Sequence, residues 1–221
     1  MHADTEAEKR LAAEAAAALV EDGMAVGLGT GSTVAHLLPA LARRELEIRC
    51  VATSPATGRA ARELGLSVEE FEALDHLDIA VDGADQIAPD GWLVKGGGGA
   101  HTREKIVAAA ADRFVVIADS TKPVDRISAP IPLELAPYGL AATLRRLRGE
   151  LGQVEVRQGA RNSPDRGVIA DYLGDVGDPL ELATRLALTP GVIDHGLFAP
   201  ELVGEVLLGR PGFVERIAVS R

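Results

Sequence analysis

The chain of 221 residues is long enough for one large domain or two smaller ones, and its composition, 47% hydrophobic and 25% charged, is that of a globular protein. Its formal net charge of -10 argues against non-specific binding to nucleic acid, which depends on Lys and Arg neutralising phosphates. The single cysteine, Cys50, excludes an intrachain disulfide and a cysteine-rich metal site, and its apolar neighbours are typical of a core position. An acidic N-terminus and the lack of an apolar run of about 18 residues predict a soluble, cytoplasmic protein.

The first predicted elements are a helix, a strand and a second helix. Thr5-Glu6-Ala7-Glu8 has the spacing of a capping box before an alanine-rich amphipathic run, and Gly23 is placed to end that helix. Residues 24–28 are typical of a short buried strand, and the apolar pattern of residues 34–41 predicts the second helix.

The loop between that strand and the second helix is Gly29-Thr30-Gly31-Ser32-Thr33. It lacks the lysine of a P-loop and the third glycine of a dinucleotide fingerprint, and no acidic residue follows the next predicted strand, residues 48–52. NAD and ATP are therefore poor candidates, whereas a terminal phosphate or sugar hydroxyls could be held by the N–H and hydroxyl donors. Plain N-capping of the helix is the alternative interpretation of Ser32 and Thr33.

A helix of about residues 56–64 and a strand of residues 78–81 follow, and the strand ends in Asp82-Gly83-Ala84-Asp85-Gln86. The carboxylates of Asp82 and Asp85 would converge at the carboxyl end of a parallel sheet, where open α/β folds bind ligands. An Asp-Gly turn without a ligand is the alternative.

The segment Lys95-Gly96-Gly97-Gly98-Gly99-Ala100-His101-Thr102-Arg103-Glu104 follows the strand-like residues 92–94. It offers a cation, unobstructed backbone N–H groups and a carboxylate where a helix begins, which predicts a site for proton chemistry on an anionic ligand. A flexible surface loop is the alternative. A further strand, residues 114–118, ends in Asp119-Ser120-Thr121-Lys122, so four strand ends bring polar groups to one edge of the sheet.

From residue 131 the pattern becomes strand, helix, strand, strand, helix, strand, which is the ferredoxin-like order. Few polar groups converge in this part, so we expect a small second domain for assembly or for covering the site. Residues 203–208 and 213–219 predict a hairpin that returns to the first domain.

The chain closely resembles the A-type ribose-5-phosphate isomerases, nearly from end to end. The resemblance is carried by Gly29-Thr30-Gly31-Ser32-Thr33, Asp82-Gly83-Ala84-Asp85, Lys95-Gly96-Gly97-Gly98, Thr102-Arg103-Glu104-Lys105, Ile117-Ala118-Asp119 with Lys122, and Gly196-Leu197-Phe198. It implies an α/β fold in which a Rossmann-like open parallel-sheet domain, residues 1–129 and 203–221, contains an inserted smaller α+β domain, residues 130–202. It also implies interconversion of ribose 5-phosphate and ribulose 5-phosphate in the pentose phosphate pathway, without cofactor or metal, in a homodimer or a dimer of dimers.

The resemblance carries over site residues one by one. The substrate-binding positions that it implies are Thr30, Gly31, Ser32, Thr33, Asp82, Gly83, Ala84, Asp85, Lys95, Gly96, Gly97, Gly98 and Lys122. The proton acceptor is Glu104, and our hypothesis for the group beside the developing oxyanion is Lys95. Asp82 and Asp85 would orient hydroxyls and assist ring opening. Gln86 stands where the family commonly has Glu, and His101 where an apolar residue is more usual.

Two other functions fit parts of the pattern. A sugar-phosphate-sensing domain would have the same pocket without turnover, and a mixed N/O metal site could be formed by His101, Glu104, Asp82 and Asp85. The favoured prediction is an enzyme whose partner is a small sugar phosphate, with neither nucleic acid nor membrane as a partner.

Overall fold

The computed structural model describes residues 4–219, and the chain divides into two compact units. Among the described residues, the first unit comprises residues 4–84, 103–123 and 200–219, and the second comprises residues 85–102 and 124–199. The glycine segment 95–99 therefore belongs to the second unit, whereas the boundaries predicted from the sequence assign it to the first domain. No helix within residues 4–219 has the length and apolar character needed to cross a bilayer.

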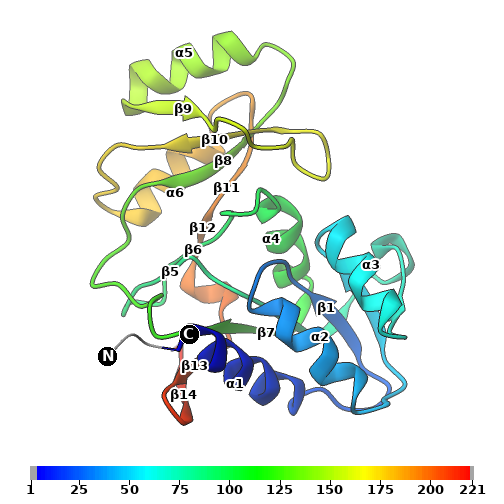
Figure 1. Ribbon diagram of the computed structural model, residues 1–221. Coiled ribbons are helices and arrows are strands. Elements are labelled where there is room, and N and C mark those ends of the chain that lie inside the picture. Colours follow the sequence, from blue (N-terminus) through cyan, green and yellow to red (C-terminus); the bar gives the residue numbers. More distant parts are fainter. Residues whose placement is uncertain (1–3, 220–221) are drawn as a thin grey trace. The chain divides into compact units, whose positions relative to one another are not determined.

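The first unit is built on a seven-stranded sheet in the order β14-β13-β7-β4-β1-β2-β3 (Figure 1). All neighbouring strands are parallel except β14, which pairs antiparallel with β13 as the predicted hairpin. The carboxyl ends of β1, β4 and β7 consequently lie at one edge of the sheet. The strands are β1 Ala25–Leu28, β2 Arg49–Ala52, β3 Ser67–Val68, β4 Leu77–Asp82, β7 Ala111–Ala118, β13 Glu205–Arg210 and β14 Phe213–Ala218.

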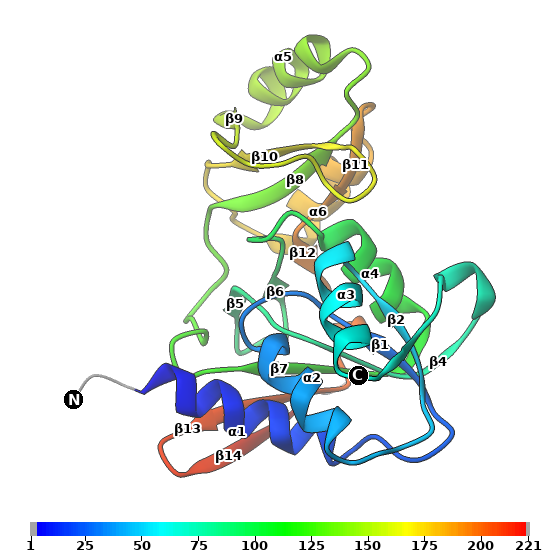
Figure 2. The ribbon, with the colours of Figure 1, turned by 45° about the vertical axis from the view of Figure 1, so that its right-hand side comes forward.

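Helices cover both faces of this sheet (Figures 1 and 2). Apolar residues of α1, α2 and α3 share one buried core with Val26 and Leu28 of β1. Gly27 points to the opposite face, where a Cβ atom on it would lie 2.5 Å from Cγ1 of Val107 in α4. Successive residues of β1 therefore face opposite sides of the sheet, one covered by α1, α2 and α3 and the other by α4. The helices are α1 Thr5–Ala17, α2 Val34–Ala42, α3 Pro55–Glu63 and α4 His101–Ala109, with short 3₁₀ turns at Phe71–Ala73 and Pro200–Leu202.

The cap of α1 differs from the predicted capping box. The side chain of Asp4 accepts a hydrogen bond from the backbone nitrogen of Ala7 at 3.2 Å, so Asp4 is the N-cap and Thr5 is the first helical residue. The prediction was one residue late because Thr and Asp are both good caps and stand side by side here. α1 also ends at Ala17, well before Gly23.

The second unit contains the predicted β-α-β-β-α-β order. Its four-stranded antiparallel sheet has the order β11-β8-β10-β9, and both helices contribute leucines to its core. A separate three-stranded sheet, β12-β6-β5, lies beside the glycine segment in the chain, and its two-residue strands are too short to be read from a periodic pattern. The elements are β5 Gln86–Ile87, β6 Leu93–Val94, β8 Ile131–Leu135, α5 Leu140–Leu151, β9 Val154–Val156, β10 Val168–Tyr172, α6 Pro179–Ala187, β11 Val192–His195 and β12 Leu197–Phe198.

Candidate active site

In the first unit, the carboxylate of Asp82 holds the glycine loop that follows β1. The Oδ1 atom of Asp82 accepts hydrogen bonds from the backbone nitrogens of Thr30, at 3.0 Å, and Gly83, at 2.7 Å. A Cβ atom on Gly29 would lie 2.0 Å from Cγ of Asp82, so a side chain at position 29 would displace this carboxylate. Asp82 is buried, and its bond to Thr30 exists because β1 and β4 are paired neighbours in the sheet.

The four predicted ligand residues of this loop have different environments. The hydroxyl of Thr30 is hydrogen-bonded to those of Thr53, at 2.8 Å, and Thr57, at 3.2 Å, so it ties the loop to the neighbouring strand and helix. Within residues 4–219, the hydroxyls of Ser32 and Thr33 form no hydrogen bond. Thr33 occupies the N-cap of α2 but makes no side-chain capping bond, so the plain-capping interpretation is wrong for Thr33.

Lys122 follows β7 and is only partly exposed. Its ammonium group forms no ion pair or hydrogen bond with any residue in the described part of the chain. Because β4 alone separates β7 from β1, the ends of β7 and β1 lie roughly 10 Å apart, at about 4.8 Å per strand spacing. An anion at this edge is thus within reach of a long lysine side chain and of the loop after β1.

A buried carboxylate from α1 supports the turn that carries Lys122. Glu8 is 1% exposed, and its Oε2 accepts a hydrogen bond from the backbone nitrogen of Ser120 at 2.9 Å. In the same turn, the backbone nitrogen of Thr121 donates to Oδ1 of Asp119 at 2.9 Å. The sequence indicated Glu8 only as part of a capping box, because its observed partner lies 112 residues further along the chain.

Glu104, the predicted base, lies in the first turn of α4 and is only 5% exposed. Val107, three residues later, packs against Gly27 of β1. Because residues three apart share one side of a helix, Glu104 lies on the sheet-facing side of α4. Its place in the first turn also favours a negative charge through the helix dipole.

In the second unit, the glycine segment is a hydrogen-bonded loop. The backbone nitrogen of Gly97 donates to Oδ2 of Asp85 at 2.8 Å, and that of Lys95 donates to the carbonyl of Gly196 at 2.9 Å. Gly96 has φ +103, and a Cβ atom on it would lie 2.7 Å from Nδ1 of the buried His101. These fixed partners contradict the interpretation of the segment as a flexible linker.

Arg157 holds the same loop by hydrogen bonds to its backbone, and it was missed by the sequence analysis. Its guanidinium donates to the carbonyls of Gly96, at 3.1 Å, and Gly97, at 2.9 Å, and forms a bidentate pair with Asp171 at 2.8 and 2.5 Å. The hydrogen bonds that Arg157 donates to Asp171 raise the pKa of Arg157 against the opposing effect of burial, and the charge of Asp85 adds to the rise. Arg157 directly follows β9, and the pairing of β9 with β10 brings this part of the chain beside Asp171.

Lys95 places a cation in a low-dielectric environment. It is 3% exposed, and its Nζ lies 5.4 Å from the centroid of the Phe198 ring. Phe198 belongs to β12, which pairs with β6 immediately before Lys95. A charge of this kind acts strongly on a nearby oxyanion because little water screens it.

Comparison with known proteins identifies the family. The family profile described as ribose 5-phosphate isomerase A (phosphoriboisomerase A) matches residues 49–212. The ribose-5-phosphate isomerase A of Caulobacter sp. strain K31 is 44% identical over 212 residues, which cover 91% of this chain and 93% of that protein. This chain belongs to the ribose 5-phosphate isomerase A family. The ribose-5-phosphate isomerase A of Nitrobacter hamburgensis, also 44% identical, aligns with 96% of this chain and 98% of its own length.

Solved structures of ribose 5-phosphate isomerases have the same fold. The crystal structure of ribose 5-phosphate isomerase A from Neisseria gonorrhoeae superposes with a TM-score of 0.93 at 32% identity and covers 99% of each chain. A D-ribose-5-phosphate isomerase in complex with phospho-erythronic acid superposes with a TM-score of 0.91 at 33% identity, covering 97% of this chain and 99% of that one. The predicted α/β fold with a smaller inserted α+β part is confirmed.

In this member of the ribose 5-phosphate isomerase A family, the predicted site residues come from both units. The first unit carries Thr30–Thr33, Asp82–Ala84, Glu104 and Lys122, and the second carries Asp85 and Lys95–Gly98. Hydrogen bonds join Asp82 to the loop after β1, and Asp85 to the glycine segment.

Gln86, one of the two departures from the family pattern, has a clear structural role. Its amide nitrogen donates a hydrogen bond to the carbonyl of Ser128 at 2.8 Å, and its amide oxygen accepts one from the backbone nitrogen of Ser128 at 2.9 Å. A glutamate could supply only the acceptor of this pair. The neutral amide therefore fixes the chain at Ser128 in this isomerase.

Glu134 contributes a second group that the sequence analysis did not find. This carboxylate on β8 is fully buried, and it accepts hydrogen bonds from the hydroxyl of Thr102, at 2.5 Å, and from that of Ser163. Thr102 lies in the first turn of α4, so Glu134 anchors the start of the helix that carries Glu104. Ser163 lies in the loop that precedes β10, and its hydrogen bond ties that loop to β8.

Proposed function

We propose that this chain interconverts D-ribose 5-phosphate and D-ribulose 5-phosphate, with Glu104 as the base. The observation that carries the proposal is the family membership over nearly the whole chain. The buried position of Glu104 in the first turn of α4 supports its role. A carboxylate removed from water and placed at a helix N-terminus is a suitable proton acceptor from carbon.

The reaction moves one proton between neighbouring carbons through an enediolate. Glu104 removes the proton from C2 of the open-chain aldose, the electron pair forms the C1–C2 double bond, and the oxygen on C1 becomes negative. The protonated Glu104 then returns the proton to C1, while the hydroxyl proton on O2 passes to O1 and leaves the C2 carbonyl of the ketose. Every atom and charge is conserved without a redox cofactor.

Lys95 and the N–H groups of Gly96 and Gly98 are the proposed partners of the oxyanion, because the N–H group of Gly97 already donates to Asp85. The burial of Lys95 and its position over Phe198 support this role, because a preorganised cation in a dry site lowers the energy of the charged intermediate. Asp82 and Asp85 are proposed to orient the sugar hydroxyls and to assist ring opening. Their backbone partners hold both carboxylates in fixed positions.

The phosphate is proposed to bind at the loop after β1, with Lys122 as its counter-charge. The hydroxyls of Ser32 and Thr33 and the ammonium of Lys122 have no partners among residues 4–219, which supports the assignment. Lys122→Gln should raise KM for ribose 5-phosphate by about tenfold or more while kcat changes little, because one charge-assisted hydrogen bond is lost. An unchanged KM would place the phosphate elsewhere.

The decisive experiment is a ketose-formation assay on purified, chelator-treated protein with ribose 5-phosphate. Turnover by the wild-type chain excludes the sugar-phosphate-sensor alternative and a catalytic metal. Glu104→Gln should abolish turnover and retain binding of phospho-erythronic acid, the ligand of a solved relative. Glu63→Gln, an exposed carboxylate at the end of α3, is the matched control and should behave like wild type. Near-normal turnover by Glu104→Gln would show that the base is another residue.

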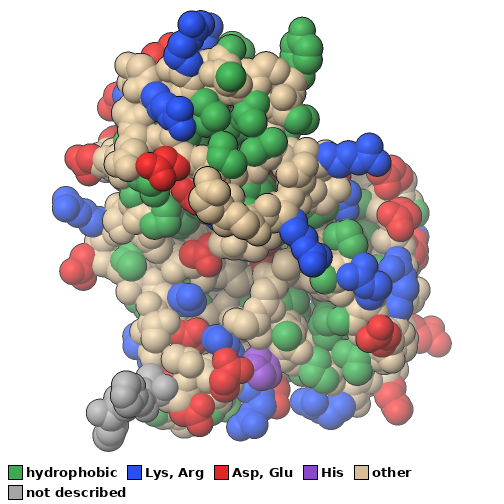
Figure 3. Space-filling model, turned by 45° about the horizontal axis from the view of Figure 1, so that its top comes forward, with side chains coloured by type: hydrophobic (Ala, Val, Ile, Leu, Met, Phe, Trp, Pro, Cys, Tyr) green, Lys and Arg blue, Asp and Glu red, His purple; other side chains and the backbone are tan. Residues whose placement is uncertain are grey.

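A homodimer or homotetramer assembled through the second unit is part of the proposal. Large apolar side chains of this unit are exposed, among them Tyr138 at 95% and Leu188 at 77%. Figure 3 shows hydrophobic side chains gathered in the upper part of one face, with Lys and Arg interspersed among Asp and Glu elsewhere. Sedimentation of wild type and Leu188→Asp tests this, since a substitution in the interface should shift the chain toward monomer. The cytoplasmic location remains a prediction from the sequence.

A further inference from the structure

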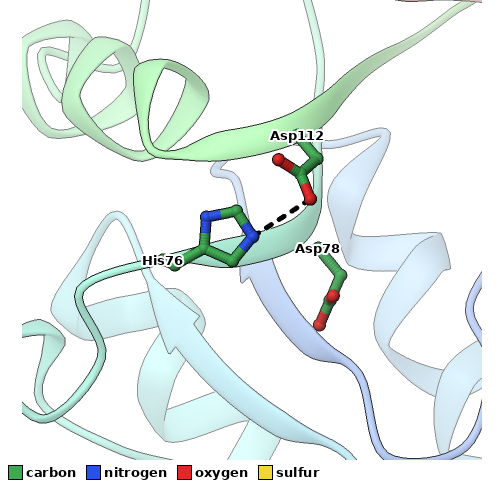
Figure 4. Close-up of side chains that lie close together, drawn as sticks. All are labelled: His76, Asp78 and Asp112. Carbon is green, nitrogen blue, oxygen red and sulfur yellow. Dashed lines mark hydrogen bonds and ion pairs between the residues drawn. The ribbon is translucent and has the colours of Figure 1, made fainter.

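Three side chains that the isomerase chemistry does not use come together in the first unit, at the amino-terminal edge of its sheet. They are His76, just before β4, Asp78 in β4 and Asp112 in β7 (Figure 4). The registers Leu77↔Ala111 and Ile79↔Arg113 place Asp78 and Asp112 side by side on neighbouring strands. All three side chains are exposed, and their ligand atoms lie within 4.8 Å of one another.

The charges of this cluster are not balanced by a basic residue. Two carboxylates side by side on paired strands repel each other. In the described part of the chain, neither Asp78 nor Asp112 forms an ion pair with Lys or Arg, and Arg113 pairs instead with Glu205. The imidazole Nε2 of His76 lies 3.0 Å from Oδ2 of Asp112 and is the nearest polar partner of that carboxylate. A cation would relieve the repulsion.

We propose that His76, Asp78 and Asp112 bind a divalent transition-metal cation, with Zn²⁺ as the representative ion. One imidazole nitrogen and two carboxylate oxygens form a three-ligand set that leaves the fourth tetrahedral position for water. Ligand atoms around tetrahedral zinc are roughly 3.3 Å apart, given bonds of about 2.0 Å, which is close to the separation of His76 and Asp112. The imidazole favours zinc, nickel or copper over magnesium and calcium.

The backbone already orients one ligand of the site. Oδ2 of Asp78 accepts a hydrogen bond from the backbone nitrogen of Ala25 at 2.7 Å. Ala25 begins β1, the other neighbour of β4, so this bond holds the carboxylate in place. Figure 4 shows the three side chains close together, with a dashed line from the ring of His76 to the carboxylate of Asp112 and the carboxylate of Asp78 nearby. Such supporting hydrogen bonds are typical of metal ligands.

The position of the cluster defines what the metal would do. Asp78 and the catalytic-edge residue Asp82 are four residues apart on the same strand, about 13 Å along the sheet. The cation therefore joins β4 to β7 at the edge opposite the isomerase site and stabilises the folded unit. It takes no part in proton transfer.

The test is calorimetric titration of untagged, chelator-treated protein with ZnCl₂, paired with thermal unfolding. We expect one site per chain and a rise in Tm of roughly 5–10 °C when free zinc is about 100-fold above Kd. His76→Ala and Asp112→Asn should each weaken binding at least about tenfold and remove most of the rise in Tm. Circular dichroism would verify that both exposed-site variants are folded.

His36→Ala is the matched control, because His36 also pairs with an exposed carboxylate, that of Glu6 at 3.1 Å, but has no third ligand among residues 4–219. It should bind zinc like wild type, and ketose formation should be the same with and without zinc. The proposal is wrong if wild type shows no saturable zinc binding, if His76→Ala binds as tightly as wild type, or if His36→Ala loses the same site. A zinc-dependent change in turnover would overturn the purely stabilising role.

Discussion

The Oδ1 atom of Asp82 lies 3.0 Å from the backbone nitrogen of Thr30, 52 residues earlier in the chain. One carboxylate thereby shapes the loop proposed to hold the phosphate and stands at the strand end proposed to face the sugar. Its role in building the loop can be separated from its charge, because asparagine retains an acceptor oxygen and alanine does not.

Asp82→Ala should raise KM for ribose 5-phosphate and lower kcat/KM by about 10- to 100-fold. The partly buried N–H groups of Thr30 and Gly83 would lose their acceptor, at a cost of about 1.5–3 kcal/mol. Asp82→Asn should keep KM near the wild-type value and lower kcat. Steady-state kinetics measure both, with the exposed Asp75→Asn as control. Equal KM values for Asp82→Ala and wild type would show that the loop does not depend on this carboxylate.

Arg157 should be essential for the shape of the glycine segment although it is distant in the sequence. Arg157→Lys removes the bidentate pair with Asp171 and at least one of the bonds to the carbonyls of Gly96 and Gly97. We expect kcat/KM to fall about tenfold or more in Arg157→Lys, and further in Arg157→Ala. Arg146→Ala, which removes an exposed ion pair with Glu150, is the control. Wild-type kinetics in Arg157→Ala would refute this role.

These groups show where sequence reasoning ends. Glu104, Asp82 and Lys95 were predicted because local motifs carry them, and a strand was predicted from residue 131, where β8 begins. Arg157 and Glu134 were missed because their partners Gly96 and Thr102 lie tens of residues away in the chain and become neighbours only in the folded unit.

Short elements were missed for a different reason. β5 and β12 have two residues each, which is too few for a period of two to be visible. They exist because β6 stands between them and pairs with both. The backbone of Lys95 is held by the carbonyl of Gly196, which immediately precedes β12, so this small sheet positions a site residue.

Glu134 should contribute to stability through its two hydroxyl donors. Glu134→Ala leaves the hydroxyls of Thr102 and Ser163 without their acceptor and opens space beside Gly167, so we expect a loss of about 2–4 kcal/mol in the free energy of unfolding. Glu134→Gln should lose less, because both hydroxyls can rotate to suit an amide. Urea unfolding measures the difference, and the exposed Glu155→Ala on β9 is the control. A loss no greater than that of Glu155→Ala would contradict the role.

Cys50 should be chemically inert in the folded protein. Burial, and secondarily the charge of Glu69, raises the pKa of its thiol from an ordinary value of 9.0 to about 12. At neutral pH the folded chain therefore presents almost no thiolate, which is the reactive form. Alkylation by iodoacetamide near pH 8 should be slow in buffer and fast in urea. Rapid alkylation of the folded chain would mean that the strand carrying Cys50 opens readily.

The same pKa difference predicts a pH-dependent stability. The folded state keeps the thiol protonated between pH 9.0 and about 12, where the unfolded chain ionises, so the contribution of Cys50 is complete below 9.0 and is lost as pH rises toward 12. From about pH 8 to about pH 10, the free energy of unfolding of wild type should fall by about 1 kcal/mol more than that of Cys50→Ala. Parallel urea titrations of the two proteins give this difference directly. Identical pH profiles would show that the thiol ionises as easily in the folded chain as in the unfolded one.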